Sequence, residues 1–571
     1  MVYFKVDKFS GIAPAVASRL LSEQFGQIAK DIDLESGLIK GAKQNGGAET
    51  TVSAASNSIY RYEYGEASSV WLQWAEEDIS VAKGPIPGDT TDRLYWTGED
   101  YPRVGWYLTI TNSAPYPTVS YALGVPRPDQ APSVAIGGAA DGTLTPNDVS
   151  YVYTIVTGDG REGPPSAASG AVAMTQGQTA TIGIPSPNLP AGKNYLTGNA
   201  LKRIYRSNTG STSAQFQLCK EVPYATLQTT DEKAAYELQE VLPSSEWIGP
   251  PDDDGTLYPD GPLQGLIPLA QGVMAGFTGK RFCLSVPFLP HAWPISYRIT
   301  TDEPIVAIAG TNNGVVALTK GKPYFITGTD PSAMTAVTVD LAQACVNKNS
   351  VVDMGEYVLY AGPDGLCQVQ GASGSVATKG LISVDQWNSD FNPTSYKAFL
   401  YEGKYVAFDG DNSWILDPSA GENTLTRFGS GEVRTAHYEP QSGELLPLFD
   451  DDNSVRKFRD GTELDNAIFK SKKFVASSPV SMGWVSIDAN AYPVTVKVYA
   501  DEVLVANYTL SKTDNVFSQA VTVPANISTS TILEPVMRMP AVVAREWEVQ
   551  VEGKDINSFC LAQSIDEVRA T

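Results

Sequence analysis

The chain of 571 residues contains little of what metal or nucleophile chemistry usually requires. It has only two histidines, His291 and His437, and five cysteines that are scattered without any C-x-x-C pair. An odd number of dispersed cysteines supports neither a disulfide framework nor a structural zinc site. We therefore predict that the cysteines are small core residues of a protein folded in a reducing cytoplasm, and we expect no metal and no cofactor.

Positive charge is also scarce. Lys and Arg number 41 against 64 Asp and Glu, which gives a net charge of −23 at pH 7. This balance argues against a protein that binds nucleic acid by neutralising its phosphates. No apolar run reaches membrane-spanning length, and charges and Pro14 interrupt the N-terminus before an apolar signal core develops. The sequence predicts no signal peptide and no stable membrane insertion.

Turn-forming and aromatic residues are abundant instead. The 50 Gly, 38 Pro and 27 Tyr are typical of a turn-rich β protein. Strand-length apolar runs follow hairpin glycines that recur every 35 to 48 residues, at Gly279, Gly314, Gly355, Gly403 and Gly443. Repeating units of this length predict a propeller-like array, in which each small sheet buries its faces against its neighbours. An irregular large β-domain with chance glycine spacing is the alternative.

The fold class predicted is mainly β. A Pro/Gly-rich connection follows Val125 and marks a domain boundary, and the short strands after it resemble a fibronectin type III module in their spacing. Val494, Val496 and Val498 alternate with polar residues, as in a half-buried strand. Four segments are predicted: residues 1–125 as an N-terminal helix and strands that join the main β body, 126–250 as an inserted β-sandwich, 251–470 as the propeller-like antiparallel body, and 471–571 as a C-terminal β-sandwich.

The N-terminal helix is predicted over about residues 18–29. Ser18 can cap it, and the apolar residues Leu20, Leu21, Phe25 and Ile28 fall on one side of a short helix.

No catalytic, cofactor-binding or metal-binding residue is predicted. His291 lies in Leu-Pro-His-Ala-Trp-Pro, which predicts a packed corner, and no Ser-His-Asp arrangement can be assembled around either histidine. Gly321 and Lys322 do not form a phosphate loop, because Val316 stands where the first glycine belongs and Pro323 replaces the Ser/Thr.

Two kinds of charge cluster could bind a partner or could simply be solvated surface. Acidic runs could supply oxygen ligands to calcium, but none has the EF-hand loop spacing, so exposed turns are favoured. A late basic group could meet an acidic neighbour or a DNA backbone, although a solvated face is the commoner case. The acidic residues are Asp252, Asp253, Asp254, Asp409, Asp411, Asp450, Asp451 and Asp452, and the basic ones are Arg456, Lys457, Arg459, Lys470, Lys472 and Lys473.

Several blocks along the chain resemble the tail tubular or nozzle proteins of short-tailed bacteriophages, which are virion structural proteins. None of these blocks is a catalytic signature. The blocks are IAPAVASRLLSEQFGQIAKDIDLESGLI, VYTIVTGDGREGPPS, LPSSEWIGPP, FLPHAWPISYRITTDEPIVAIA, KPYFITGTDPSAM, QACVNKNSVVDMGEYVLYAGPDGL, AREWEVQVEG and LAQSIDEV.

The resemblance implies a structural subunit and not an enzyme. It implies a homohexameric ring in the virion tail, made in the host cytoplasm and docked below the head-to-tail adaptor, through which double-stranded DNA passes without specific binding. Contacts with tail fibres or spikes are a further expectation. Because bound Lys and Arg would hold DNA, we predict an acidic or neutral channel lining.

Two other classes of function stay open. A carbohydrate-active propeller enzyme needs only paired carboxylates, which 64 acids could supply, although the Asp-box repeat Ser-x-Asp-x-Gly-x-x-Trp is missing from every hairpin. A host-binding tail adhesin would use exposed aromatic residues as its contact surface.

Overall fold

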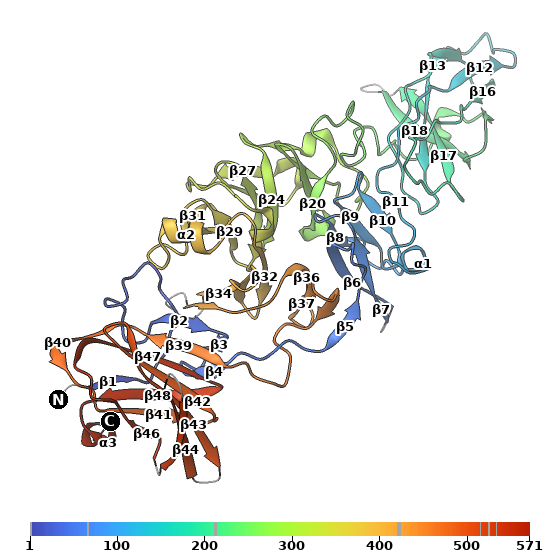
Figure 1. Cartoon of the computed structure of the whole chain (residues 1–571). Helices are drawn as coiled ribbons and strands as arrows, with labels where there is room; N and C mark the ends of the chain where they lie inside the picture. The colour runs from blue at the N-terminus through green and yellow to red at the C-terminus, as the bar shows by residue number, and fades with distance from the viewer. Residues whose placement is uncertain are drawn as a thin grey trace.

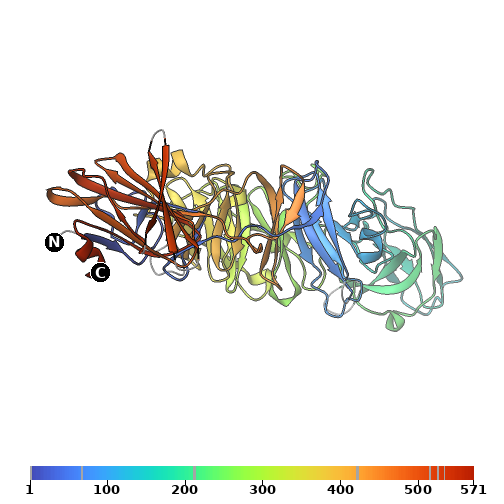
Figure 2. The same cartoon turned by 60° about the horizontal axis from the view of Figure 1, so that its bottom comes forward.

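A computed structural model describes residues 3–65, 68–209, 214–418, 424–513, 516–523, 526–532 and 534–570. Strands account for 46% of the chain and helices for 7%, so the prediction of a mainly β protein with many antiparallel sheets is confirmed. The molecule is elongated, with three parts in a row: a domain inserted in the chain, a group of small sheets, and a terminal domain that holds both ends of the chain (Figures 1 and 2).

The middle part consists of seven small groups of antiparallel strands, of which six are separate sheets and one continues into a sheet of the terminal domain. In chain order, its sheets are β6 (Ser58–Tyr64) with β7 (Ser68–Trp74); β8 (Ser80–Lys83), β9 (Leu94–Thr97), β10 (Arg103–Gly105) and β11 (Tyr121–Ala122); β20 (Gln264–Pro268), β21 (Met274–Thr278), β22 (Arg281–Leu284) and β23 (Ile299–Thr300); β24 (Ile305–Thr311), β25 (Gly314–Thr319), β26 (Tyr324–Thr327) and β27 (Thr335–Thr338); β28 (Val352–Asp353), β29 (Val358–Gly362), β30 (Gly365–Gln370) and β31 (Ser373–Val376); β32 (Lys397–Tyr401), β33 (Lys404–Phe408), β34 (Trp414–Asp417) and β35 (Thr424–Arg427); and β36 (Val433–Glu439), β37 (Glu444–Phe449), β38 (Ser454–Arg456) and β5 (Ala48–Thr51).

These sheets surround a cavity of about 440 Å³, and all seven contribute lining residues through β6, β8, β20, β24, β28, β32, β36 or the turns beside them. The strand β5 comes from the N-terminal part of the chain and completes the last sheet by pairing with β38. This sheet therefore joins the first strand of the middle part, in chain order, to its last strands.

The hairpin glycines lie at turns, as predicted. Gly314, Gly403 and Gly443 each connect the first two strands of a sheet, Gly355 precedes β29, and Gly279 connects β21 with β22. Four of the five have φ between 54° and 87°, the left-handed region that a side chain disfavours. The spacing of these glycines was a reliable signal because the turn conformation itself requires glycine.

The inserted domain contains eight strands, which pair only with one another among the described residues. They form a sheet of β12 (Ser133–Gly137), β16 (Thr179–Gly183) and β19 (Gln228–Asp231), a ladder of β13 (Asn147–Val149) with β15 (Val172–Met174), and a sheet of β14 (Tyr151–Val156), β17 (Leu201–Thr209) and β18 (Ala214–Pro223).

The terminal domain combines strands from both ends of the chain in two sheets. One contains β3 (Ile32–Asp33), β4 (Ile39–Gly41), β48 (Asp555–Ala562), β41 (Trp484–Ala489) and β46 (Val536–Arg538), with β1 (Tyr3–Val6) also paired to β48. The other contains β2 (Gly26–Lys30), β39 (Ala467–Ser471), β47 (Ala544–Gly553), β42 (Val494–Ala500), β43 (Val503–Thr513), β44 (Val516–Val523) and β45 (Asn526–Ile532), with β40 (Phe474–Val480) beside β47. This second sheet is continuous with β32–β35 of the middle part, because β2 pairs in parallel with β35.

This pairing corrects the expected role of residues 1–125. The first four strands pair mainly with the C-terminal strands, although β2 also pairs with β35 of the main body, and the later strands β5 to β11 lie within that body. The predicted alternation along β42 is confirmed, because its residues alternate between buried and half-buried throughout.

The predicted helix over residues 18–29 is wrong. Turns occupy the segment until β2 begins, and Leu20 is 68% exposed while Leu21 is buried. The segment is fixed by distant contacts, since Ile12 N donates to the Leu425 carbonyl and Gly26 pairs with Ser471 of β39. Tertiary contacts here outweigh a weak local helical pattern.

Helices are short throughout the described chain. They are α1 (Tyr107–Ile110), α2 (Val384–Asp390) and α3 (Ile565–Ala570), and the one-turn 3-10 segments η1 (Ala235–Glu237), η2 (Ala270–Gly272), η3 (Ile295–Tyr297), η4 (Pro331–Ala333) and η5 (Lys348–Ser350).

Candidate functional site

The central cavity has a polar wall whose cations are paired within the chain. Lys348 Nζ lies 3.1 Å from Asp78 Oδ1, and Lys397 Nζ donates to the main-chain oxygen of Arg434. Arg434 Nε in turn lies 3.1 Å from Asp450 Oδ1. Burial lowers the pKa of Lys397. These ion pairs and the hydrogen bond from Lys397 neutralise or engage the three cations within the chain.

A second candidate lies where the inserted domain leaves the middle part. The two linkers touch there, because a methyl group added at Gly124 would lie 3.3 Å from the Cα of Gly249. The chain thus enters and leaves the inserted domain at one point. This close approach explains why both positions hold glycine, since a Cβ at either would press on the other linker.

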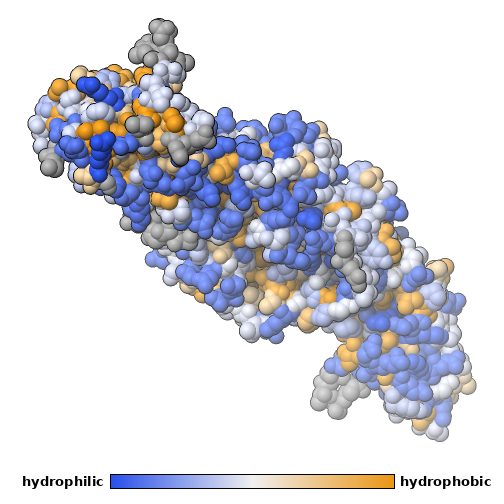
Figure 3. Space-filling view, turned by 90° about the horizontal axis from the view of Figure 1, so that it is seen from below, coloured by the Kyte–Doolittle hydropathy of each residue, from blue (hydrophilic) through white to orange (hydrophobic). Residues whose placement is uncertain are grey.

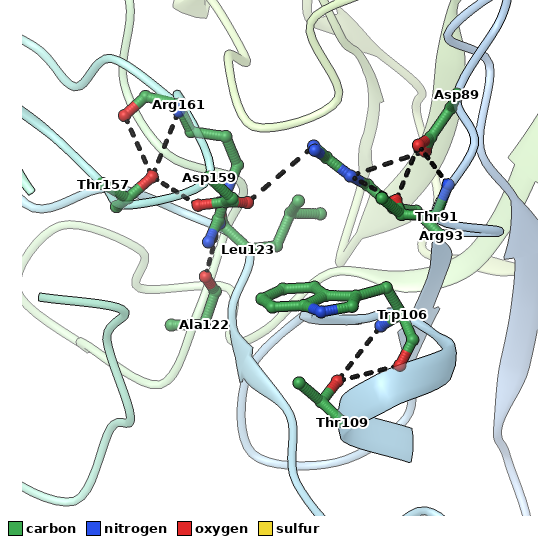
Figure 4. A network of polar contacts seen from close by, with 10 residues as sticks. All are labelled: Asp89, Thr91, Arg93, Trp106, Thr109, Ala122, Leu123, Thr157, Asp159 and Arg161. Atoms are coloured by element: carbon green, nitrogen blue, oxygen red, sulfur yellow. Dashed lines mark hydrogen bonds and ion pairs between the residues drawn. The ribbon is translucent and has the colours of Figure 1, made fainter. Parts of the chain in front are cut away.

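Buried ionic contacts fix the inserted domain at this junction (Figure 4). Arg161 Nη1 donates to the main-chain oxygens of Ala122 and Leu123, both at 2.7 Å, and its Nε donates to Asp159 Oδ2 at 2.7 Å. The same carboxylate oxygen lies 3.8 Å from Arg93 Nη1 of the middle part. Burial acts to raise the pKa of Asp159, but the arginines outweigh it and the pKa is lowered.

His291 lies in the packed corner that the sequence predicted. It is 6% exposed, its ring meets Trp247 edge-on at 6.0 Å, and neighbouring Trp293 is fully buried. Burial and the nearby Arg161 charge lower the pKa of His291 to about 3. Burial therefore keeps this imidazole neutral, packed against the aromatic ring of Trp247 at the junction.

Beside this network lies a pocket of about 670 Å³ between the linkers, the inserted domain and the middle part. Its wall includes Tyr101, Tyr195, Tyr258 and Arg298, with Leu257 at the rim. The sequence did not reveal this site, because its residues come from six separate stretches. The available signal was the pair of proline-rich linkers, which mark the place but not the chemistry.

The acidic runs are engaged in turns and ion pairs. Lys193 Nζ lies 2.5 Å from Asp252 Oδ2 and 2.7 Å from Asp253 Oδ1, and Asp254 accepts from the main chain of Thr256. Within the part of the chain that the structure describes, no group of three or more His, Cys, Asp or Glu could hold a metal ion.

The other acidic residues behave in the same way. Asp452 pairs with Arg456 and accepts from Ser454, while Asp409 accepts from Asn392 at 2.8 Å. Asp411 and Asp409 form an isolated main-chain β-bridge within one turn. Asp409 and Asp452 thus lie in turns of the middle part, whereas Asp252 lies in the linker that follows the inserted domain.

The basic residues do not form one positive surface. Arg456, Lys457 and Arg459 belong to the middle part, whereas Lys470 lies in β39 of the terminal domain and Lys472 and Lys473 follow that strand. Four of the six are in ion pairs: Arg456 with Asp452, Lys457 with Glu444 at 2.7 Å, Lys470 with Glu548 at 2.9 Å, and Lys473 with Glu502 at 2.7 Å and Glu546 at 3.0 Å.

Lys322 and His437 each have an acidic partner within the chain. Lys322, in a hairpin turn, pairs with Asp340 at 3.1 Å, and His437 lies 3.5 Å from Glu439 in a buried setting that lowers its pKa. All five cysteines are buried, as predicted, and no disulfide joins them. Across the described ranges, no helix is long and apolar enough to cross a membrane.

Comparisons with known proteins identify no family. No family model matches the chain, and no curated protein matches it. PorZ, described as an essential bacterial surface component of the type-IX secretion system of Porphyromonas gingivalis, is similar at 10% identity and a TM-score of 0.26, over 78% of this chain and 51% of that chain. Hsv2 of Kluyvelomyces marxianus is similar at 9% identity and a TM-score of 0.23, over 61% and 94%. The chain spans about half the length of PorZ, and TM-scores this low do not establish a shared fold.

Proposed function

We propose that this chain is a structural subunit of the tail nozzle of a short-tailed bacteriophage, assembled in the virion as a homohexameric ring below the head-to-tail adaptor. Genomic DNA passes through the ring during ejection. The chain does no chemistry in this role, and its partners are its own copies, the adaptor, and possible tail fibres or spikes.

The observation that carries the proposal is the row of three parts (Figures 1 and 2). A tube wall needs long, stiff subunits that lie side by side, and each joint in this chain is packed and hydrogen-bonded. Both termini lie in one end domain, so the opposite end is free to carry a different set of contacts. Ring closure about an axis then requires one face of each subunit to meet a different face of the next.

We further propose that the middle part is a seven-bladed propeller. Each of the seven sheets contributes to one cavity, and neighbouring inner strands contact one another around it, as with β20 and β24, β24 and β28, and β32 and β36. The pairing of β5 with β38 supports closure, because a shared blade holds the two ends of such a ring together.

The blocks that resemble nozzle proteins coincide with joints of the molecule. AREWEVQVEG is β47, which pairs with β39, β40 and β42 in the terminal domain. LPSSEWIGPP and the His291 segment meet where Trp293 N donates to the Ile248 carbonyl at 2.9 Å. The first block therefore lies inside the terminal domain, and the other two meet at the junction with the inserted domain.

Charge supports a channel that does not hold DNA. The net charge of −23 is large, and basic residues that could have formed a phosphate-binding surface are paired with acids. On the face shown in Figure 3, apolar residues are scattered among polar ones. We expect acidic or neutral groups near the ring axis.

The enzyme alternative has less support. Glycoside hydrolysis requires two carboxyl groups free to act as acid and base or nucleophile. At the junction pocket, Asp252 and Asp253 both bind Lys193, which ties up the carboxylates nearest to its aromatic wall. The adhesin alternative would make the inserted domain, with Tyr236 82% exposed, the contact surface.

Native mass measurement tests the proposal. We expect purified chain, alone or with the adaptor, to reach about six times 61.1 kDa, with each interface burying more than roughly 1,000 Å². A species that stays at 61.1 kDa at micromolar concentration, even with the adaptor present, contradicts it.

A further inference from the structure

The junction pocket has the size and lining of a small-molecule site. Its volume of about 670 Å³ lies in the range typical of ligand pockets, and it sits between two domains, where such sites are common. The rings of Tyr101, Tyr195 and Tyr258 form apolar wall, and Leu257 and Ile295 at the rim are 67% and 63% exposed. Large apolar side chains this exposed at a cavity mouth indicate surface available to a ligand body.

Arg298, just after η3, supplies the polar feature of this wall. Its Nε and Nη2 atoms are buried and have no hydrogen-bond partner. The guanidinium lies 5.8 Å from the centre of the Tyr258 ring. Buried guanidinium N–H groups in folded proteins rarely lack a hydrogen-bond acceptor. This pair of atoms therefore points to a missing acceptor.

The acids near the pocket do not supply that acceptor. Asp252 and Asp253 bind Lys193, and Asp254 Oδ1 accepts from the main-chain nitrogens of Thr256 and Leu257. No ion pair joins any of them to Arg298 among the described residues. The pocket therefore contains an arginine without a counter-ion beside an aromatic wall.

We propose that the junction pocket binds a small molecule that carries a carboxylate on a six-membered ring. Nε and Nη2 lie on one edge of the guanidinium, and their spacing matches the two oxygens of a carboxylate. The ring packs between the tyrosines and the apolar rim. Because Nε and Nη2 are buried, binding requires an Arg298 rotamer that presents both donors to the ligand. Among the described residues, no recorded hydrogen bond or ion pair of this side chain has to break for that change.

Binding here also restrains the inserted domain. The pocket is lined by both linkers, through Gly124 to Arg127 on one side and Ile248 to Asp254 on the other. A ligand that contacts both linkers stabilises the state in which they touch. We expect bound ligand to slow protease cleavage within the linkers, in proportion to its affinity.

Calorimetry with the full chain and three probes tests the proposal. Benzoate and glucuronate both carry a carboxylate on a ring, one aromatic and one hydroxylated, while inorganic phosphate has charge and no ring. We expect at least one ring carboxylate to bind with a Kd of about 1 mM or tighter, and at least tenfold more tightly than phosphate. Tighter benzoate binding identifies an aromatic acid as the ligand class, and tighter glucuronate binding an acidic sugar. Absence of binding by both, or equal binding of phosphate, overturns the proposal.

Variants separate the pocket from general charge. Arg298→Gln lowers the affinity at least tenfold, whereas Arg127→Gln, at an exposed arginine of the same pocket, changes it less than twofold. Leu257→Glu adds a repelling charge at the rim and weakens binding, while Leu227→Glu, at a 60% exposed leucine outside the pocket, does not. Because both leucines are exposed, this second pair stays informative even if Arg298→Gln fails to fold. Unchanged affinity in Leu257→Glu, or in a folded Arg298→Gln, contradicts the site.

Discussion

The two ends of the molecule are attached to the middle part by opposite physical means. The terminal domain shares a continuous apolar core with the sheets β28 to β35, which includes Leu425, Trp414 and Leu359 on one side and Phe469 and Trp547 on the other. The inserted domain has apolar clusters of its own and meets the middle part through the buried ionic network around Arg161 (Figure 4).

This difference teaches which parts can move or be exchanged. An apolar joint is non-directional and shared by many side chains, so it makes two domains unfold as one. A polar joint depends on a few directional bonds and can be broken at a single residue. The terminal domain is thus part of the frame, and the inserted domain is a separately folded attachment.

The largest expected effect comes from the apolar joint. Phe469 is fully buried, and its ring meets Phe9 edge-on at 4.9 Å. Phe469→Ala should lower the free energy of unfolding by about 3 to 5 kcal/mol, because it removes buried apolar surface and leaves a cavity. Urea unfolding should show the middle part and the terminal domain losing stability together. Separate transitions, with the middle part unaffected, would refute the shared core.

Arg161→Ala tests the polar joint. Loss of the guanidinium leaves the buried Asp159 carboxylate without its nearest cation, which should cost roughly 3 kcal/mol of docking free energy. We expect faster protease cleavage in the linkers, with little change in unfolding of the middle part. Arg203→Ala, at a partly exposed arginine within the inserted domain, is the control and should leave linker cleavage unchanged.

The polar joint should also be sensitive to acid. The pKa of His291 is about 3 in the folded protein against about 6.5 when unfolded, so between these values only the unfolded state binds the proton. The free energy that stabilises the folded joint should therefore fall as pH drops below about 6.5, with a slope of up to about 1.4 kcal/mol per pH unit. Above that pH, His291 should have no effect on the pH dependence of this free energy.

His291→Gln should remove this slope from linker cleavage measured across pH 4 to 7. His437→Gln is the matched control, because it also removes a buried histidine of lowered pKa but lies in β36, away from the linkers. An acid response of the linkers that persists in His291→Gln would assign the effect to another group.

The smallest effect is expected from removing the inserted domain altogether. Since Gly124 and Gly249 touch, joining them and deleting residues 125–248 needs little rearrangement. We expect the unfolding midpoint of the remaining chain in urea to shift less than in Phe469→Ala. A remainder that no longer folds would mean that the two parts share a core after all.

The sequence predicted features that depend on local chemistry. Hairpin glycines such as Gly403 and Gly443 marked turns because positive φ requires them, and the Val494 to Val498 alternation identified a half-buried strand. Pairing between residues hundreds of positions apart left no local signal, as with Phe4 of β1 and Leu561 of β48. The junction pocket was missed for the same reason, because only folding brings Tyr101 beside Arg298.

Electron microscopy of the purified assembly tests the central claim of a ring-shaped channel most directly. The account predicts a closed ring of six elongated subunits around a central hole, with acidic or neutral residues of each chain nearest to the axis. A monomer, an open filament, or a closed ring whose lining is mainly Lys and Arg would contradict it.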